Sequence, residues 1–281
     1  MEKISVIGAG TMGNGIAHVF GLSGYSVSLI DISEELVNKA VNTIKLNLDR
    51  QVKKGVITPD QAAGAVTKIR AIAGVENTPA DSELVIEAVY EDKETKSRIY
   101  GLLNDIVAPD AIIATNTSSV SITELAAAVK GSHRFIGMHF MNPVPVMQLV
   151  EIIRGLNTSG STYEAVRDLA VDIGKTPVEV YDYPGFISNR ILMPMINEAV
   201  FALMEGVASR DDIDTVMKLG MNHPMGPLQL ADFIGLDVCL NIMQVLYNGF
   251  SDSKYRPCPL LKKMVASGKL GRKSGEGFYS Y

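Results

Sequence analysis

Hydrophobic residues along the first two thirds of the chain alternate between two kinds of pattern. Short continuous runs, such as residues 3–7 and 82–89, are typical of strands buried on both faces of a parallel sheet. Longer segments, such as residues 33–54, carry hydrophobic residues at helical spacing with charged residues between them. Because strand-like and helix-like segments follow one another up to about residue 180, we expect a mostly parallel α/β sheet.

Turn and capping residues separate the remaining elements of this part. Helices are predicted after the glycines at residues 8–13 and from Ser33, Thr58 and Ser121, the last with Glu124 in a capping-box pattern. A further charged helix is expected over residues 92–107. The other predicted strands cover residues 26–31, 111–115, 134–140, 146–153 and 176–182.

The pattern changes near residue 184, after which helix signals dominate and strand signals nearly vanish. We therefore expect an α/β domain over residues 1–184 and a second, all-helical domain over residues 185–281. Helices are predicted over residues 190–207 and 209–220, and as one long apolar helix from Pro227 to about residue 247.

Composition and charge exclude several classes of function. The 281 residues are 47% hydrophobic and 20% charged, as in an ordinary globular protein, and the formal net charge of −5 argues against nucleic-acid and anionic-membrane surfaces. Cys239 and Cys258 form no CxxC pair, and no His, Cys or acidic cluster has metal-binding spacing, so no metal is expected. Without a signal-peptide pattern or an apolar run near the ~20 residues of a membrane span, we expect a cytoplasmic protein.

A glycine loop follows the first predicted strand and opens the first predicted helix. Gly8, Gly10, Thr11, Met12 and Gly13 lie in a G-x-G-x-x-G motif, in which the glycines permit a tight turn, close approach of a pyrophosphate and close helix packing. The helix N-terminus would attract the pyrophosphate. In this context we predict a Rossmann-like dinucleotide site, the alternative being a purely structural turn.

Asp31 ends the second predicted strand, where an acidic residue binds the ribose 2′-hydroxyl of NAD in this fold. Its carboxylate would repel the 2′-phosphate of NADP, and no arginine follows closely in DISEELVNK. The sequence therefore favours NAD over NADP.

His139 and Glu151 are ionisable residues within otherwise apolar strand-like segments. Pro143 and Pro145 lie between them and indicate a turn that folds one segment back on the other. An imidazole titrates near pH 6.5 and a carboxylate can fix its tautomer, so the pair could take the alcohol proton that a nicotinamide does not accept. From the residues alone, a core histidine and a buried structural glutamate remain an equally good reading.

Seven segments together carry a resemblance to a known family: GAGTMGNGIA, IEAVYED, ATNTSS, GMHFMNPVPVMQLVEII, PGFISNRIL, MNHPMGPLQLAD and GRKSGEGFY. In their order and spacing the chain resembles the 3-hydroxyacyl-CoA dehydrogenases, most closely the short bacterial 3-hydroxybutyryl-CoA dehydrogenases. The resemblance implies an N-terminal NAD domain and a helical C-terminal domain for substrate binding and homodimerisation. It also implies that His139 and Glu151 form the catalytic dyad.

The same resemblance implies roles for three polar residues. Ser118 would contact both the substrate oxygen and the cofactor, and Asn189 would lie near the substrate thioester. Asn142 would contact the nicotinamide side of the cofactor. Without the resemblance, Ser118 reads as a loop serine, Asn142 as a turn residue and Asn189 as a helix N-cap.

Charged residues complete the site that the resemblance implies. Glu91, Lys96 and Lys273 would contact the cofactor, and Lys54 the CoA part of the substrate, a role that the neighbouring Lys53 could equally fill. Without the family, Glu91 and Lys96 would be interpreted as a solvated charged helix face.

The expected function is interconversion of (3S)-3-hydroxyacyl-CoA and 3-oxoacyl-CoA by hydride transfer to or from NAD, as in fatty acid and butanoate metabolism. The resemblance favours 3-hydroxybutyryl-CoA and acetoacetyl-CoA as the pair, while the sequence leaves chain length, direction and any oligomer beyond a dimer open. One alternative is an NAD-dependent dehydrogenase of a free hydroxy acid or sugar acid. Another is a catalytically idle NAD-binding structural protein on the same fold.

Overall fold

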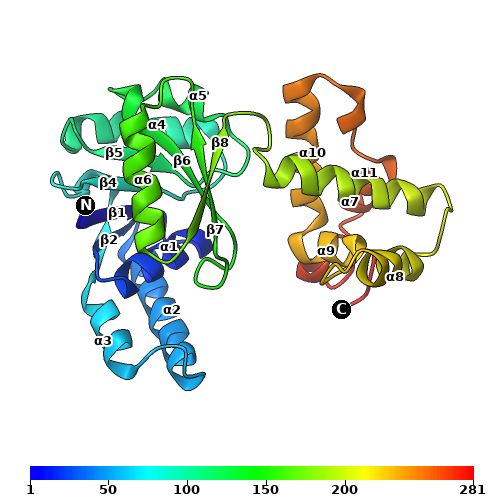
Figure 1. Cartoon of the computed structure of the whole chain (residues 1–281), viewed down its shortest axis with the longest axis horizontal. Coiled ribbons are helices and arrows are strands. Elements are labelled where there is room, and N and C mark those ends of the chain that lie inside the picture. Colours follow the sequence, from blue (N-terminus) through cyan, green and yellow to red (C-terminus); the bar gives the residue numbers. More distant parts are fainter. The chain divides into compact units, whose positions relative to one another are not determined.

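A computed structural model describes residues 1–281 of the protein. The chain forms two compact units, Met1–Asp182 and Tyr183–Tyr281. The first contains the whole sheet and the second is helical (Figure 1).

One eight-stranded sheet runs through the first unit in the order β3-β2-β1-β4-β5-β6-β7-β8. All neighbouring strands are parallel except β6 and β7, so the predicted fold class is confirmed. The edge strand β3 was not predicted, because its sequence IRAIA is short and only half-buried, which weakens the strand pattern. The strands are β1 Lys3–Ile7, β2 Ser26–Asp31, β3 Ile69–Ala73, β4 Leu84–Glu87, β5 Ile112–Thr115, β6 Phe135–Phe140, β7 Leu149–Arg154 and β8 Thr176–Tyr181.

Capping residues begin the helices of this unit much as the sequence indicates. Ser33 accepts a hydrogen bond from the backbone of Leu36, and Thr58 forms a full capping box with Gln61. Ser121 caps its helix, but the Glu124 side chain pairs with a lysine instead of completing a capping box. The helices are α1 Thr11–Leu22, α2 Glu34–Lys53, α3 Pro59–Thr67, α4 Lys93–Ile106, α5 Ile122–Ala126 and α6 Gly160–Asp172, with short 3₁₀ turns η1 Val75–Asn77 and η2 Ser132–Arg134.

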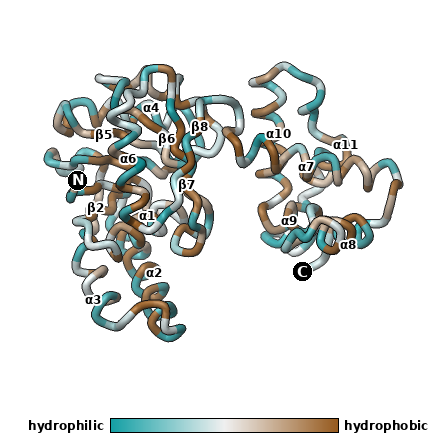
Figure 2. The backbone as a smooth tube through the Cα atoms, viewed as in Figure 1, coloured by the Kyte–Doolittle hydropathy of each residue, from teal (hydrophilic) through white to brown (hydrophobic).

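The core of the first unit lies between the sheet and its helices. In the view of Figure 1, α6 lies in front of the sheet and α4 behind it. Figure 2 shows hydrophobic stretches along β5, β6 and β7. Phe20, Leu29, Ile86 and Met138 are fully buried, and burying a large apolar side chain contributes about 1.5–3 kcal/mol. This packing fixes the carboxyl ends of the central strands.

The helical unit has a separate hydrophobic core that includes Met193, Val200, Leu228, Leu246 and Leu261. Its helices are α7 Ser188–Met204, α8 Arg210–Gly220, α9 Pro227–Ile234, α10 Leu236–Phe250 and α11 Pro259–Ala266, with 3₁₀ turns η3 Ser253–Tyr255 and η4 Arg272–Ser274.

The single long helix predicted from Pro227 is wrong. Gly235 has a φ of +106°, outside the helical region, and the chain bends there by 98° between α9 and α10. No single helix in the structure is long and apolar enough to cross a membrane, and this bent pair reaches that length and composition only when taken together.

Two buried aspartates fasten the C-terminal segment to the helical unit. Asp232 accepts hydrogen bonds from the backbone of Phe278 at 2.9 Å and of Tyr279 at 2.8 Å. Asp214 accepts hydrogen bonds from the first turn of α9 and from the Tyr279 hydroxyl. Burial raises the pKa of Asp232, although these hydrogen bonds oppose the shift. The irregular tail is therefore held by charged hydrogen-bond acceptors, with little regular secondary structure of its own.

Candidate active site

The glycines of this loop have two different roles: two are required by the fold, and one leaves space for a ligand. Gly8 has a φ of +101°, and a Cβ on Gly13 would lie 1.6 Å from the Gly8 carbonyl oxygen, so the fold itself requires both glycines. A Cβ on Gly10 would meet no atom within 4 Å. Gly10 is also the N-cap of α1 and provides no side-chain cap. The backbone N–H groups at this helix end therefore suit a phosphate group.

Asp31 lies at the carboxyl end of β2 and faces the same loop. Its Oδ2 accepts a hydrogen bond from the Ala9 backbone at 2.6 Å, and its Oδ1 accepts one from the Ile32 backbone at 2.7 Å. Each carboxylate oxygen has two lone pairs, so both can accept a further hydrogen bond from a ribose hydroxyl. The other two loop residues of the predicted site, Thr11 and Met12, form the first turn of α1.

His139 and Glu151 meet across the antiparallel strands β6 and β7, where they are directly paired in register. The distance from His139 Nδ1 to Glu151 Oε2 is 2.8 Å, and both side chains are buried. In the tautomer that donates from Nδ1 to the carboxylate, the lone pair of the neutral imidazole lies on Nε2. The arrangement can accept a proton and stabilise the resulting imidazolium.

Glu91 organises the loop that follows β5. Its Oε1 accepts hydrogen bonds from Thr117 Oγ1 at 2.5 Å and from the backbones of Ser118 and Ser119 at 2.8 and 3.0 Å. Both serine hydroxyls also donate to it. Burial alone would raise the pKa of Glu91, but Lys96 and these hydrogen bonds together lower it below its ordinary value. Glu91 is thus held as a carboxylate that fixes the position of Ser118.

Lys96 is fully buried and ion-paired, so its interpretation as part of a solvated helix face is wrong. Its Nζ lies 2.8 Å from Glu87 Oε1 and 3.3 Å from Glu91 Oε2. The buried Glu87 also accepts hydrogen bonds from the Tyr100 and Thr115 hydroxyls at 2.6 and 2.8 Å. Sequence reasoning missed Glu87, although a carboxylate ending an apolar strand with a lysine nine residues later was a visible signal.

Asn116 is a second residue that sequence reasoning missed. Its Oδ1 accepts a hydrogen bond from the backbone of Phe140 at 2.9 Å, which ties the end of β5 to the end of β6 beside His139. Asn142, two residues after Phe140, is exposed, and the peptide bond that joins it to Pro143 is cis. Lys54 is exposed at the C-terminal end of α2.

The remaining predicted site residues lie in the helical unit. Asn189 is the second residue of α7 and is buried, and the N-cap position belongs to Ile187, so the N-cap reading of Asn189 is wrong. Lys273 lies in η4 and forms an ion pair with Asp237 at 2.5 Å.

Models of one known protein family match both parts of the chain. Residues 3–183 match the family described as "3-hydroxyacyl-CoA dehydrogenase, NAD binding domain", and residues 185–281 match its "C-terminal domain". The chain belongs to the 3-hydroxyacyl-CoA dehydrogenase family.

Relatives within this family are similar over their full length. The 3-hydroxybutyryl-CoA dehydrogenase of Bradyrhizobium diazoefficiens is 53% identical, over 100% of this chain and 96% of the relative. That of Clostridioides difficile is 48% identical, over 99% of each chain. A crystal structure of (S)-3-hydroxybutyryl-CoA dehydrogenase from Ralstonia eutropha superposes with a TM-score of 0.98 at 50% identity, covering 100% of this chain and 99% of the other.

In this 3-hydroxyacyl-CoA dehydrogenase, the residues of the candidate site gather at the carboxyl ends of the sheet strands. Five strands each have one site residue at or just beyond their carboxyl end: β1 has Gly10, β2 Asp31, β4 Glu91, β5 Ser118 and β6 His139. Chain order reverses between β1 and β4, and open α/β sheets bind ligands beyond the carboxyl ends of strands at such a point. The loop for a dinucleotide and the His–Glu pair thus belong to one edge of the first unit.

Proposed function

We propose that the protein interconverts (3S)-3-hydroxybutyryl-CoA and acetoacetyl-CoA with NAD as the hydride carrier. The observation that carries this proposal is the His139–Glu151 hydrogen bond at 2.8 Å, at the same sheet edge as a glycine loop suited to a dinucleotide. The full-length similarity to 3-hydroxybutyryl-CoA dehydrogenases supports the choice of substrate.

Residues of the first unit fit NAD. The glycine loop and the start of α1 would hold the pyrophosphate, as the open space at Gly10 and the uncapped helix end suggest. The residues concerned are Gly8, Gly10, Thr11, Met12 and Gly13. The Asp31 carboxylate would accept the ribose hydroxyls and repel the additional phosphate of NADP, so NAD is the proposed cofactor.

Further cofactor contacts come from Glu91, Ser118, Asn142 and Lys273. Lys96 would act on the cofactor only indirectly, by holding Glu91, because its ammonium is buried between two carboxylates. We therefore assign Lys96 a positioning role, in place of the direct cofactor contact expected from the family resemblance.

In the proposed mechanism His139 acts as general base and acid. During oxidation, Nε2 takes the proton of the substrate hydroxyl, and Glu151 stabilises the imidazolium through the hydrogen bond at Nδ1. Bound NAD would accept the hydride from the substrate carbon that carries this hydroxyl. Such proton transfer contributes about 10²–10⁴-fold to the rate. In the reverse direction the imidazolium returns its proton to the oxygen of the 3-oxo group.

Three residues orient the substrate in this proposal. The backbone N–H of Ser118 stays bonded to Glu91 and holds the residue in place, while its hydroxyl turns from Glu91 and donates its hydrogen to the reacting oxygen. Asn189 binds the thioester carbonyl. Lys54, or the adjacent Lys53, attracts the phosphates of CoA, since both lysines are exposed and cationic.

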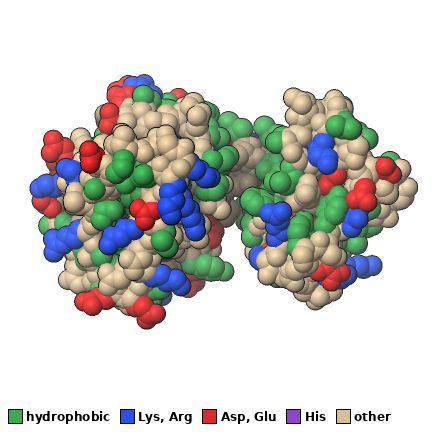
Figure 3. All heavy atoms as spheres, turned by 90° about the horizontal axis from the view of Figure 1, so that it is seen from below, with side chains coloured by type: hydrophobic (Ala, Val, Ile, Leu, Met, Phe, Trp, Pro, Cys, Tyr) green, Lys and Arg blue, Asp and Glu red, His purple; other side chains and the backbone are tan.

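We further propose that the helical unit forms a homodimer interface. Figure 3 shows hydrophobic side chains grouped on the exposed surface of this unit. An apolar cavity of 440 Å³ lies among α7, α8 and the start of α9, and Val207 and Val216 on its wall are more than half exposed. Light scattering coupled to size-exclusion chromatography tests this proposal. A monomeric protein at micromolar concentration would contradict it.

The proposed location is the cytoplasm. Cys239 and Cys258 are both buried and unpaired, which suits a compartment where thiols stay reduced.

Initial rates test the substrate and cofactor together. Acetoacetyl-CoA should be reduced with NADH far faster than with NADPH, and free acetoacetate should be a poor substrate with either. Equal turnover of acetoacetate would favour a dehydrogenase of free hydroxy acids. A complete lack of NADH oxidation with 3-oxoacyl-CoAs of every length would favour an idle NAD-binding protein.

A further inference from the structure

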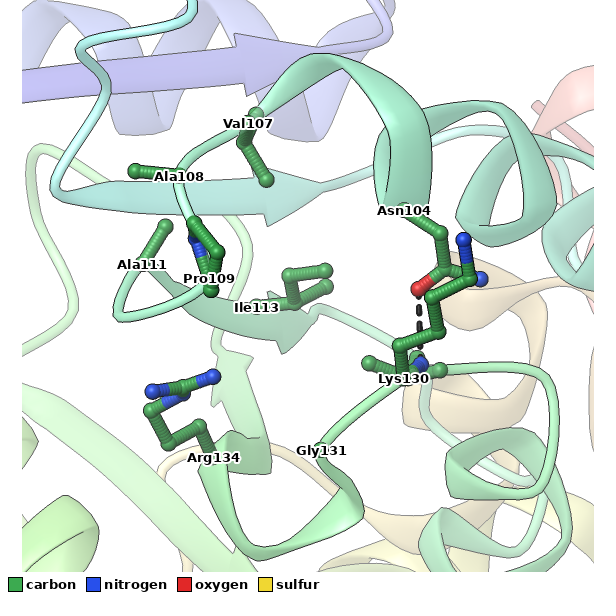
Figure 4. Close-up of a pocket in the computed structure, with 10 residues that line it drawn as sticks. Asn104, Val107, Ala108, Pro109, Ala111, Ile113, Lys130, Gly131 and Arg134 are labelled. Carbon is green, nitrogen blue, oxygen red and sulfur yellow. Dashed lines mark hydrogen bonds between the residues drawn. The ribbon is translucent and has the colours of Figure 1, made fainter.

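A cavity of 240 Å³ lies in the first unit at the amino ends of β5 and β6 (Figure 4). Val107, Pro109, Ala111 and Ile113 form an apolar part of its wall. The proposed active site lies at the other ends of these strands: Arg134 directly precedes β6 and His139 follows it by five residues, about 16 Å along a strand. The cavity is therefore separate from the groups assigned to catalysis.

Arg134 provides the cavity with an unsatisfied hydrogen-bond donor. Its Nε is buried and has no hydrogen-bond partner. Figure 4 shows its guanidinium extending below Pro109 and Ala111. Gly131 lies near this guanidinium, since a Cβ there would come within 3.1 Å of Arg134 Nη2. A buried donor without a partner costs free energy that a bound acceptor would recover.

Lys130, the second cation of this cavity, is already engaged. Its Nζ lies 2.7 Å from Asp105 Oδ1, and its backbone N–H donates to Asn104 Oδ1 at 2.7 Å. The Asn104 side chain also donates to the carbonyl of Ala128 at 2.9 Å. These bonds tie α4 to the loop that precedes η2 and hold the wall in place. Arg134 is thus the cation that remains to neutralise a ligand.

We infer that this cavity binds a small monocarboxylate with a short apolar chain. The planar guanidinium of Arg134 matches a carboxylate and can bond it through two parallel N–H groups. The apolar wall suits a chain of a few methylene groups, and the volume accommodates about eight water-sized groups. Its ligand class is therefore that of free short-chain fatty acids, bound away from the residues proposed to act on an acyl thioester.

Calorimetric titration with hexanoate tests this inference on the full-length protein. We expect saturable binding in the millimolar range, and a loss of affinity of about tenfold or more in Arg134→Met. Lys130→Met is the matched control, since it removes a cation from the same cavity, and its affinity should stay within about twofold. Hexan-1-ol, which keeps the chain and lacks the charge, should bind both variants equally and weakly.

Four outcomes would overturn the inference: absence of saturable hexanoate binding, unchanged affinity in Arg134→Met, an equal loss in Lys130→Met, or displacement of hexanoate by inorganic phosphate at equal concentration. The last would show that the site recognises charge alone. If Arg134→Met does not fold, Ala108→Leu fills the cavity while leaving the guanidinium in place. Binding that survives this filling would also contradict the inference.

Discussion

His139 and Glu151 form a directly paired couple on two antiparallel strands, with 2.8 Å between Nδ1 and Oε2. Burial excludes water from this bond, which strengthens the interaction of the carboxylate with a protonated imidazole. The chain turns back between β6 and β7, and the antiparallel register of these two strands places Glu151 directly opposite His139. Sheet topology therefore sets the chemistry of the proposed dyad.

Glu151→Gln should retain the fold and lose most of the turnover, because the amide can still accept from Nδ1 but no longer stabilises the imidazolium. We expect kcat for acetoacetyl-CoA reduction to fall by about 10²-fold, measured from initial rates. Glu179→Gln is the control, since this carboxylate lies on the neighbouring strand β8 and pairs with Arg154. Equal losses in the two variants would rule out a specific role for Glu151.

Gly10→Ala and Gly13→Ala should separate cofactor binding from folding. A methyl group on Gly10 points into open space, so the free energy of unfolding should stay within about 0.5 kcal/mol while the affinity for NADH falls. A methyl group on Gly13 would collide with the Gly8 carbonyl and should destabilise the fold by about 1–3 kcal/mol or more. Urea unfolding and NADH fluorescence titration measure the two effects. Unchanged NADH affinity in Gly10→Ala would contradict a pyrophosphate site at this residue.

Lys96→Met should strongly destabilise the protein, because it leaves Glu87 and Glu91 without the buried ammonium between them. The free energy of unfolding should fall by about 3–5 kcal/mol. Lys93→Met on the same helix removes only an exposed ion pair with Glu124 and should cost at most about 1 kcal/mol. Urea unfolding curves measure both changes, and equal values would show that the buried network contributes nothing specific.

The contrast between Lys96 and His139 shows what the sequence could predict. The pattern of strands and prolines indicated the return from β6 to β7, and the family resemblance indicated the dyad. Lys96 lies on a helix with the charge pattern of a surface, and only the tertiary position of Glu87 makes its burial favourable. The break at Gly235 was hidden for a similar reason, since an isolated glycine inside a helical pattern is compatible with a continuous helix.

His18 should make stability depend on pH. Burial is the main cause that lowers the pKa of this side chain from 6.5 to about 4, with Lys175 lowering it further and Gln51 opposing the shift. Because the folded state takes up the proton only near pH 4 and the unfolded state near pH 6.5, stability should decrease as pH falls between these values. The loss should reach about 3 kcal/mol near pH 4.

His18→Met isolates this contribution from the carboxylates that titrate in the same range. The difference in unfolding free energy between wild type and variant should change across this interval, as measured by urea unfolding at several pH values. A difference independent of pH would show that His18 titrates alike in both states.

The most direct test of the proposed mechanism is the turnover of His139→Gln with acetoacetyl-CoA and NADH, accompanied by NADH titration. We expect unchanged NADH affinity and a fall in kcat of about 10²-fold to 10⁴-fold, because glutamine occupies similar space without accepting the proton. Turnover close to that of the wild type would show that a group other than His139 is the base.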